Sequence, residues 1–224
     1  MGKILFRIGS VDDQKIPVLI EPVYYSFTCA DAFFFVIDTG DPADAAGRPG
    51  HHALLNDIDP YLDEQRAWLK REMASEACRK AKYRIMLAHA TPFEFESRAN
   101  ARNVARIAAE AFYGENAPCK LDLWICGDVH QVYRWDPVSK IRAGRPRPVG
   151  AKPMTKADIE NVRFPVVVND GPNAGNAKQT VMRVNVAGDG IRVTTMSPDG
   201  KRIDEFTARR GAPLEVHSTL YKNY

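Results

Sequence analysis

The chain has few cysteines and no long apolar run. Its 224 residues include four cysteines, Cys29, Cys78, Cys119 and Cys126. None of them share a Cys-x-x-Cys spacing, so the sequence predicts neither a zinc ribbon nor a disulfide framework. No stretch approaches the roughly 18 apolar residues that a membrane span needs, and the apolar stretch after Met1 is too short for a signal peptide. We therefore expect a soluble chain with no membrane partner, while its compartment stays open.

An excess of charge of one sign is also nearly absent. The chain has 31 lysines and arginines against 28 acidic residues, which gives a formal net charge of +3 and a pI of about 8.6. This excess is too small to argue for a nucleic-acid partner. The cations that gather in residues 136–163 have no aromatic side chains between them that could stack on bases. We expect no nucleic-acid partner.

The apolar residues that are present suffice for one ordinary core. The hydrophobic fraction is 45% and the charged fraction 26%, which is typical of a single globular domain. Apolar runs alternate with amphipathic helical patterns, which favours a small parallel or mixed sheet, and the turns Asp189-Gly190 and Asp199-Gly200 indicate hairpins. We expect strands at 23–28, 33–38, 83–88 and 121–126, helices at 60–79 and from Val104 to Gly114, and an antiparallel meander of strands at 164–169, 179–187, 191–197 and 202–207.

Two of the expected strands stop at side chains that can bind metals. The run Tyr83 to Ala88 ends at His89, and the run Leu121 to Cys126 ends in Gly127-Asp128-Val129-His130. Gly127 allows the backbone to turn where the polar residues begin. Histidine and aspartate at the ends of neighbouring strands suggest a metal site.

These motifs, in this order, resemble the calcineurin-like metallophosphoesterases, and within them the branch that contains the purple acid phosphatases. In that family one strand ends in a ligand histidine that a proline-containing loop follows, and a second ends in Gly-His-x-His. The order of His89, Pro92 and Gly127-Asp128-Val129-His130 is similar. Further similarities are Tyr24 to Thr39, the Gln-x-x-Trp-Leu pattern of residues 65–69 and the closing strand of residues 200–206, so that the resemblance covers roughly residues 22 to 210.

The resemblance implies a site that hydrolyses a phosphate-ester substrate. His89, Asp128 and His130 would be ligands of Fe, Zn or Mn ions, and Asp128 stands where the family has a histidine. A bound metal lowers the pKa of water and so makes hydroxide available at neutral pH. Imidazole and carboxylate donors suit these metals.

Three further residues would contact the substrate by the same resemblance. Arg134 is in step with the arginine of the family's His-x-Tyr-x-Arg continuation. Asn169 and Asn173 belong to a stretch that is similar to the loop ending the family's catalytic sheet. The alternative for that stretch is a tight turn.

The resemblance covers only one half of the family's fold. In the family, the N-terminal half carries the first metal ligands in the blocks Asp-x-His, Gly-Asp-x-x-(Asp/Tyr) and Gly-Asn-His, and none of these is found before Tyr24. Gly40 to Asp44 matches the pattern Gly-Asp-x-x-Asp. It lies too close to Gly50-His51-His52, however, for the helix and strand that separate these two blocks in the family. We therefore expect an α/β (α+β) fold in which residues 1–210 form the C-terminal half of the metallophosphoesterase β-sandwich, flanked by helices. Residues 136–163 are expected to be a basic, proline-rich loop that acts as a lid or is a mobile insertion, and 211–224 a polar C-terminal tail.

Three functions are compatible with these features. The first is a metal-dependent phosphoesterase whose N-terminal ligand half is absent from this chain, so that the chain alone would be a poor dinuclear hydrolase. The second is a non-catalytic remnant that binds partners through the basic segment. The third is a mononuclear metal protein built from His89, Asp128 and His130. The expected protein partner is the missing half or a second copy of the chain.

Overall fold

The structure is a computed structural model, and it describes residues 4–6, 18–20, 23–39, 58–93, 104–127, 132–144, 153–169 and 180–219. These residues form two larger sheets, a short hairpin and four helices. The strands are β1 (Ile4–Phe6), β2 (Val18–Ile20), β3 (Tyr25–Cys29), β4 (Ala32–Val36), β5 (Tyr83–Leu87), β6 (Leu123–Cys126), β7 (Val132–Asp136), β8 (Ile141–Gly144), β9 (Val166–Asn169), β10 (Val181–Ala187), β11 (Gly190–Met196), β12 (Arg202–Ala208) and β13 (Glu215–Thr219), and the helices are α1 (Ile58–Met73), α2 (Glu76–Lys80), α3 (Val104–Glu110) and α4 (Lys156–Asn161).

The larger sheet has seven strands in the order β3-β4-β5-β6-β9-β7-β8. Its centre, β4 to β9, is parallel, while β3, β7 and β8 are antiparallel to their neighbours. The central strands are short runs of aliphatic and aromatic residues, as expected for strands that are covered on both faces. Parallel pairing brings the carboxyl ends of β5, β6 and β9 to one edge of the sheet.

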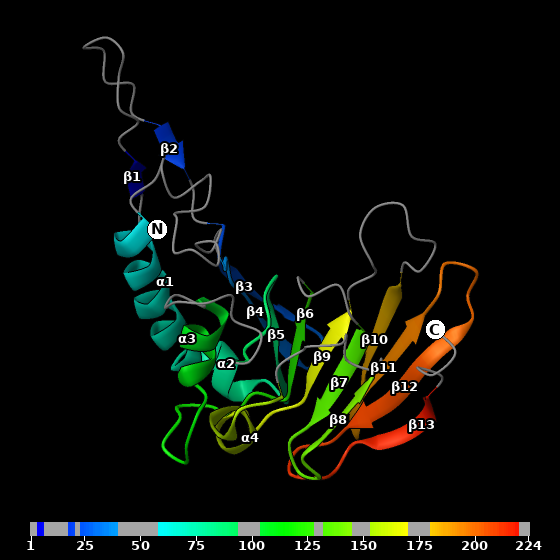
Figure 1. Cartoon of the computed structure of the whole chain (residues 1–224). Coiled ribbons are helices and arrows are strands. Elements are labelled where there is room, and N and C mark those ends of the chain that lie inside the picture. The colour runs from blue at the N-terminus through cyan, green and yellow to red at the C-terminus, as the bar shows by residue number, and fades with distance from the viewer. Residues whose placement is uncertain are drawn as a thin grey trace.

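The two faces of this sheet are covered by different layers (Figure 1). Helices α1, α2 and α3 lie on one face, and the antiparallel sheet β10-β11-β12-β13 lies on the other. Helix α1 is amphipathic: Leu62, Gln65, Leu69 and Met73 recur at helical spacing and are buried. The molecule is therefore a sandwich of two sheets with helices on the outer face of the larger one.

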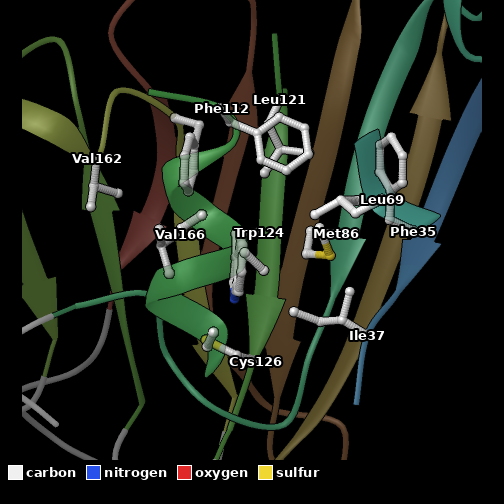
Figure 2. Close-up of a cluster of buried hydrophobic side chains, with 14 of the residues drawn as sticks. Phe35, Ile37, Leu69, Met86, Phe112, Leu121, Trp124, Cys126, Val162 and Val166 are labelled. Carbon is white, nitrogen blue, oxygen red and sulfur yellow. The ribbon is translucent and has the colours of Figure 1, made fainter. Parts of the chain in front are cut away.

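The main core lies between the helices and the seven-stranded sheet. Figure 2 shows Leu69 of α1 and Phe112 at the end of α3 directed at Met86, Trp124 and Val166 of the sheet. Trp124 stacks on Phe164, with ring centroids 5.9 Å apart. Burial of large side chains of this kind stabilises each by roughly 1.5 to 3 kcal/mol relative to exposure.

A second core joins the two sheets. Ile85, Leu123 and Val167 of the larger sheet pack with Ile191 and Phe206 of the smaller one. The alternation of side chains along β5 and β6 sends one set of residues to each core. The α/β (α+β) fold class and the sandwich flanked by helices are therefore confirmed.

Several predicted elements are confirmed with small changes in their bounds. The hairpin is β3 and β4, and the predicted strands at 83–88 and 121–126 are β5 and β6. The single helix predicted at 60–79 is two helices, because the chain turns at Ala74 and Ser75, where Ser75 caps α2 by accepting from the Cys78 backbone N–H at 3.1 Å. Among the described residues no helix is long and apolar enough to cross a membrane.

Three predictions for the second half of the chain were wrong. The strand predicted at 164–169 is β9, which belongs to the larger sheet between β6 and β7 and not to the meander. The segment 136–163, predicted as a loop, contains strand β8 and helix α4, the latter with a capping box between Thr155 and Asp158. The segment 211–224, predicted as a polar tail, contains β13, which pairs with β12.

Candidate functional site

The ends of β5 and β6 meet at one edge of the larger sheet. Backbone pairing continues beyond both strands: the Ala88 N–H donates to the Ile125 carbonyl at 3.0 Å, and the Gly127 N–H donates to the His89 carbonyl at 2.8 Å. The segment that continues into Asp128 and His130 therefore starts in hydrogen-bond contact with His89. This confirms the prediction that the ends of these two strands lie side by side.

A cavity of about 320 Å³ lies at this edge, between the two sheets. His89, Gly127 and Asn169 contribute its polar lining, and Met182 and Val184 of β10 face them from the smaller sheet. Three of the predicted segments thus converge on one cavity. Figure 1 shows the carboxyl ends of β5, β6 and β9 side by side.

Asn169 has an amide oxygen without a partner. Its Oδ1 atom is buried and accepts no hydrogen bond from any residue that the structure describes. A buried polar oxygen is costly to leave unpaired, so such atoms are commonly satisfied by water, an ion or a ligand. This side chain is a candidate donor to a metal or a hydrogen-bond partner for a substrate.

The predicted metal ligands are only partly covered by the structure. His89 is exposed at the edge of the cavity, whereas Asp128, His130 and Asn173 lie outside the described residues. Within the described ranges no three His, Cys, Asp or Glu side chains form a group that could hold a metal ion. The described part of the site supplies one imidazole and one amide oxygen, which fit two positions of a metal site with nitrogen and oxygen donors. The ligand set stays a prediction.

Arg134 lies outside the cavity at the strand ends. Its guanidinium group is buried between the two sheets and forms an ion pair with Asp204 of β12. Only 7% of its side-chain surface is exposed. The structure therefore does not bring Arg134 together with His89 and Asn169 in the described cavity, and its contact with a substrate stays a prediction.

One carboxylate at the same edge was not among the predicted site residues. Asp38 follows β4, which pairs in parallel with β5 through Val36 and Leu87. The Gln65 side chain of α1 fixes its backbone by accepting from the Asp38 N–H at 2.8 Å and donating to the Asp38 carbonyl at 2.9 Å. The sequence signal was present, because Asp38 directly follows an apolar strand as His89 does.

The hydroxyl group of Tyr61 is bound to this carboxylate. It donates to Asp38 Oδ2 at 2.9 Å. Burial raises the pKa of Tyr61, and the negative charge of Asp38 raises it further. Tyr61 therefore stays protonated at neutral pH and acts as a hydrogen-bond donor to Asp38.

Comparison with known proteins gives a distant structural likeness. A scan against models of protein families and a search of curated proteins find no match. Among solved structures, one described as PhoD is similar over 88% of this chain and 44% of its own, with 13% identity and a TM-score of 0.48. The purple acid phosphatase PPD1 from yellow lupin (Lupinus luteus) seeds is similar over 82% of this chain and 32% of its own, with 15% identity and a TM-score of 0.43.

The chain thus spans less than half of the length of either structure. The second of these structures is described as a phosphatase, and the first is described only as PhoD. Likeness of this degree does not assign an activity, so the function has to be argued from the residues of this chain.

Proposed function

We propose that the edge formed by β5, β6 and β9 is the metal-binding part of a site that hydrolyses phosphate esters. The observation that carries the proposal is the backbone hydrogen bond from Gly127 to the His89 carbonyl, which joins the two strand ends that bear the candidate ligands. His89, Asp128 and His130 would bind the metal. Three such donors leave a coordination position open, as in hydrolytic metal sites.

Each described residue of the site has a separate task in this proposal. A bound Fe, Zn or Mn ion would supply a hydroxide nucleophile at neutral pH. His89 presents a ring nitrogen to it, and the pairing of β5 with β6 fixes the position of the His89 backbone. The Asn169 side chain, which lines the cavity, would coordinate the metal through its Oδ1 atom or accept a hydrogen bond from the substrate. Met182 and Val184 form an apolar wall of the cavity opposite these residues.

The first test is metal content, which does not depend on turnover. The chain is purified, stripped with a chelator, and titrated with Zn²⁺ and Mn²⁺ while binding is followed by calorimetry. We expect His89→Ala and His130→Ala each to weaken metal binding by at least about ten-fold, since each removes a direct ligand. His217→Gln on β13 is the matched control and should bind metal like the wild type.

The number of ions separates the phosphoesterase from a mononuclear metal protein. One ion per chain bound by the wild type, with no hydrolysis of an aryl phosphate, favours the mononuclear protein. Hydrolysis that depends on metal and is abolished by His130→Ala supports the phosphoesterase. Equal metal binding by the wild type and by both alanine variants would overturn the site, and the binding remnant would then be the better hypothesis.

A substitution at Asp128 tests the metal preference of the site. Asp128→His replaces a hard oxygen donor by an imidazole, which suits Zn and Fe better. We expect tighter Zn²⁺ binding than in the wild type, measured in the same titration. If Asp128→His and His130→Ala both leave metal binding unchanged, these two positions are not ligands.

A further inference from the structure

A second cavity lies at the opposite edge of the larger sheet. Its volume is about 300 Å³, and it is lined by residues that precede β6 and β9, by the turn after α3, by the β7–β8 turn and by the connection between β12 and β13. Strand β6 separates this cavity from the candidate metal site. Asp122 precedes β6 and lines this cavity, and Gly127 follows β6 and lines the other. At the rise per residue of an extended strand, these two residues are roughly 16 Å apart. This cavity has no role in the function proposed above.

The floor of this cavity is apolar. Phe112, Leu121 and Phe164 are all buried in the core and also line the cavity. Phe112 and Phe164 meet edge to face, with ring centroids 6.3 Å apart and an angle of 77° between the rings. Pro137 and Val138 of the β7–β8 turn form part of the wall, where Val138 is 47% exposed. Together with the small exposed parts of Phe112, Leu121 and Phe164, these two residues give the cavity an apolar face.

One wall of the cavity holds an arginine that other residues fix in place. Arg210 donates from Nε and Nη2 to the two oxygens of Asp122, both at 2.7 Å, and from Nη2 to the Lys82 carbonyl at 2.9 Å. Asp122 also accepts from the Arg84 backbone N–H at 2.8 Å. Within the part of the chain that the structure describes, nothing accepts from Nη1 of Arg210. The guanidinium group is thus oriented in advance and keeps two N–H donors for a ligand.

Two further cations at the rim form no ion pair with a described acid. Lys120 and Arg163 line the cavity, and neither forms an ion pair with any carboxylate among the described residues; Arg163 donates from Nε to the Glu160 carbonyl at 3.1 Å. Arg209, the fourth cation, is held by Asp189 and Glu215. The acidic side chain of Glu115 stands on the same rim. The donors available to a ligand are therefore those of Lys120, Arg163 and Arg210.

We propose that this cavity binds a small organic anion, in which one carboxylate or phosphate group is attached to a flat apolar body. The anion would contact Lys120, Arg163 and the Nη1 group of Arg210. The apolar body would lie against Pro137, Val138 and the small exposed parts of Phe112 and Phe164. The volume is at the lower end of the range for small-molecule sites, which suits a ligand of one ring. A carboxylate or phosphate matches the geometry of a guanidinium group.

Binding is tested with four simple probes and the full chain. Phenyl phosphate and benzoate carry both features of the ligand, whereas inorganic phosphate carries only the charge and phenol only the ring. We expect calorimetry or ligand-detected NMR to show binding of phenyl phosphate or benzoate, and weaker binding of the two partial probes. Whichever of phenyl phosphate and benzoate binds more tightly identifies the anionic group. Inorganic phosphate that binds as tightly as phenyl phosphate would overturn the apolar part of the proposal.

The location is tested with paired charge variants. The double variant Lys120→Ala/Arg163→Ala should weaken binding of the tighter probe by about ten-fold or more, because it removes two charged donors. The double variant Arg66→Ala/Lys201→Ala removes the same charge elsewhere on the surface and should bind normally, as should His89→Ala. All substituted side chains in the paired variants are exposed, so folding is checked simply by thermal melting.

Three results would overturn the proposed location. They are unchanged binding in the Lys120→Ala/Arg163→Ala variant, equal weakening in the control pair, and loss of binding in His89→Ala. The addition of a negative charge at the rim by Val138→Glu gives an independent check and should also weaken binding. Absence of binding for all four probes would overturn the proposal as a whole.

Discussion

At the scale of single residues, one buried ion pair joins the two sheets. Arg134 of β7 and Asp204 of β12 pair with only 7% and 1% of their side-chain surfaces exposed. Arg134 also lies over the ring of Phe206, 5.7 Å from its centroid. Because a buried charge without its partner is costly, the loss of one member should destabilise the protein more than the loss of both.

This asymmetry gives the first prediction. Arg134→Met should lower the free energy of unfolding by about 3 to 5 kcal/mol, since the Asp204 carboxylate is left buried without its cation. The double variant Arg134→Met/Asp204→Leu should recover part of that loss. Urea denaturation measures both, with the exposed Arg66→Ala as a control that costs less than about 1 kcal/mol. Losses that simply add in the double variant would contradict a coupled pair.

A second prediction concerns the carboxylate of Asp136. Burial alone would raise the pKa of Asp136, but hydrogen bonds from the Ser139 hydroxyl and from the N–H groups of Leu214, Val138 and Ser139 outweigh it and hold the pKa below its ordinary value of 3.8. A depressed pKa stabilises the folded state above the pKa of the unfolded chain, and this stabilisation is lost as the pH falls through the folded value. Asp136→Asn should therefore cost about 1 to 3 kcal/mol at neutral pH.

The pH dependence separates this effect from a general loss of packing. The difference in unfolding free energy between the wild type and Asp136→Asn should shrink as the pH falls below about 4, because the wild-type carboxylate is then protonated as well. Denaturation curves from neutral pH down to pH 3 measure it. A difference that stays constant over this range would show that the charge of Asp136 is not what stabilises the turn.

The sequence predicts the position of His89 better than that of Arg134, for a physical reason. A residue at a strand end is placed by the length of an apolar run, which the sequence shows directly. The position of a side chain inside a strand depends on the face of the sheet to which it points, and successive side chains point to opposite faces. In β7, Tyr133 and Trp135 lie in the core under the helices, so Arg134 points to the smaller sheet. The two aromatic neighbours could have indicated this, whereas a motif spacing alone could not.

At the scale of elements, the local elements follow from the sequence and the long-range pairings do not. Strand β6 is a continuous apolar run, β5 is apolar except for Arg84, and the β10–β11 hairpin has a strong turn signal. Strand β9 was wrongly predicted to belong to the meander. Its partners are β6 and β7, and the residues Val166–Asn169 carry no local signal for this pairing. Strand β13 was missed because it lies at a sheet edge, where polar residues such as Glu215 and His217 are tolerated.

Strand β8 was missed because it lies within residues 136–163, a segment that is rich in basic residues and proline. The structure shows that it pairs closely with β7, where Gly144 stands opposite Tyr133. An added Cβ atom at Gly144 would lie 2.6 Å from the carbonyl oxygen of Val132. The approach of these two backbones requires a glycine.

This close approach gives a third prediction. Gly144→Ala should destabilise the protein by about 1 to 3 kcal/mol, because the added methyl group forces the two strands apart. Gly188→Ala is the matched control, since an added Cβ atom there meets nothing within 4 Å. Both are measured by thermal unfolding. Equal effects of the two substitutions would show that β7 and β8 can separate at little cost.

At the scale of the whole molecule, the two sheets of the sandwich differ in width. The smaller sheet has four strands and the larger has seven. Strand β10 faces β5 and β6 across the cavity at the strand ends. Strand β4 still contributes Ala32 and Phe34 to the core between the sheets, whereas the edge strand β3 is mostly exposed. The cavity proposed to bind a metal and the cavity proposed to bind an anion lie at opposite ends of the same central strands. The first is also lined by β10, and the second by the connection between β12 and β13.

The edge strand β3 of the larger sheet bears exposed aromatic side chains. Tyr25 and Phe27 on the edge strand β3 are 53% and 40% exposed. Phe27 stacks on Phe34 of β4 with ring centroids 4.6 Å apart. An edge strand with exposed apolar side chains favours pairing with another chain.

The last prediction is that the purified chain self-associates through β3. Sedimentation velocity over a wide concentration range should show a reversible monomer–oligomer equilibrium, and Phe27→Lys should shift it to monomer because the charge is placed on the apolar edge. Val138→Lys changes an equally exposed apolar residue on the β7–β8 turn and should leave the equilibrium as it is. The sequence also led us to expect a protein partner that carries the Asp-x-His, Gly-Asp-x-x-(Asp/Tyr) and Gly-Asn-His blocks. If that expectation holds, a fragment with these blocks should raise the melting temperature of the wild type but not that of Phe27→Lys. A chain that stays monomeric at every concentration, and whose melting no such fragment changes, would show that β3 needs no partner.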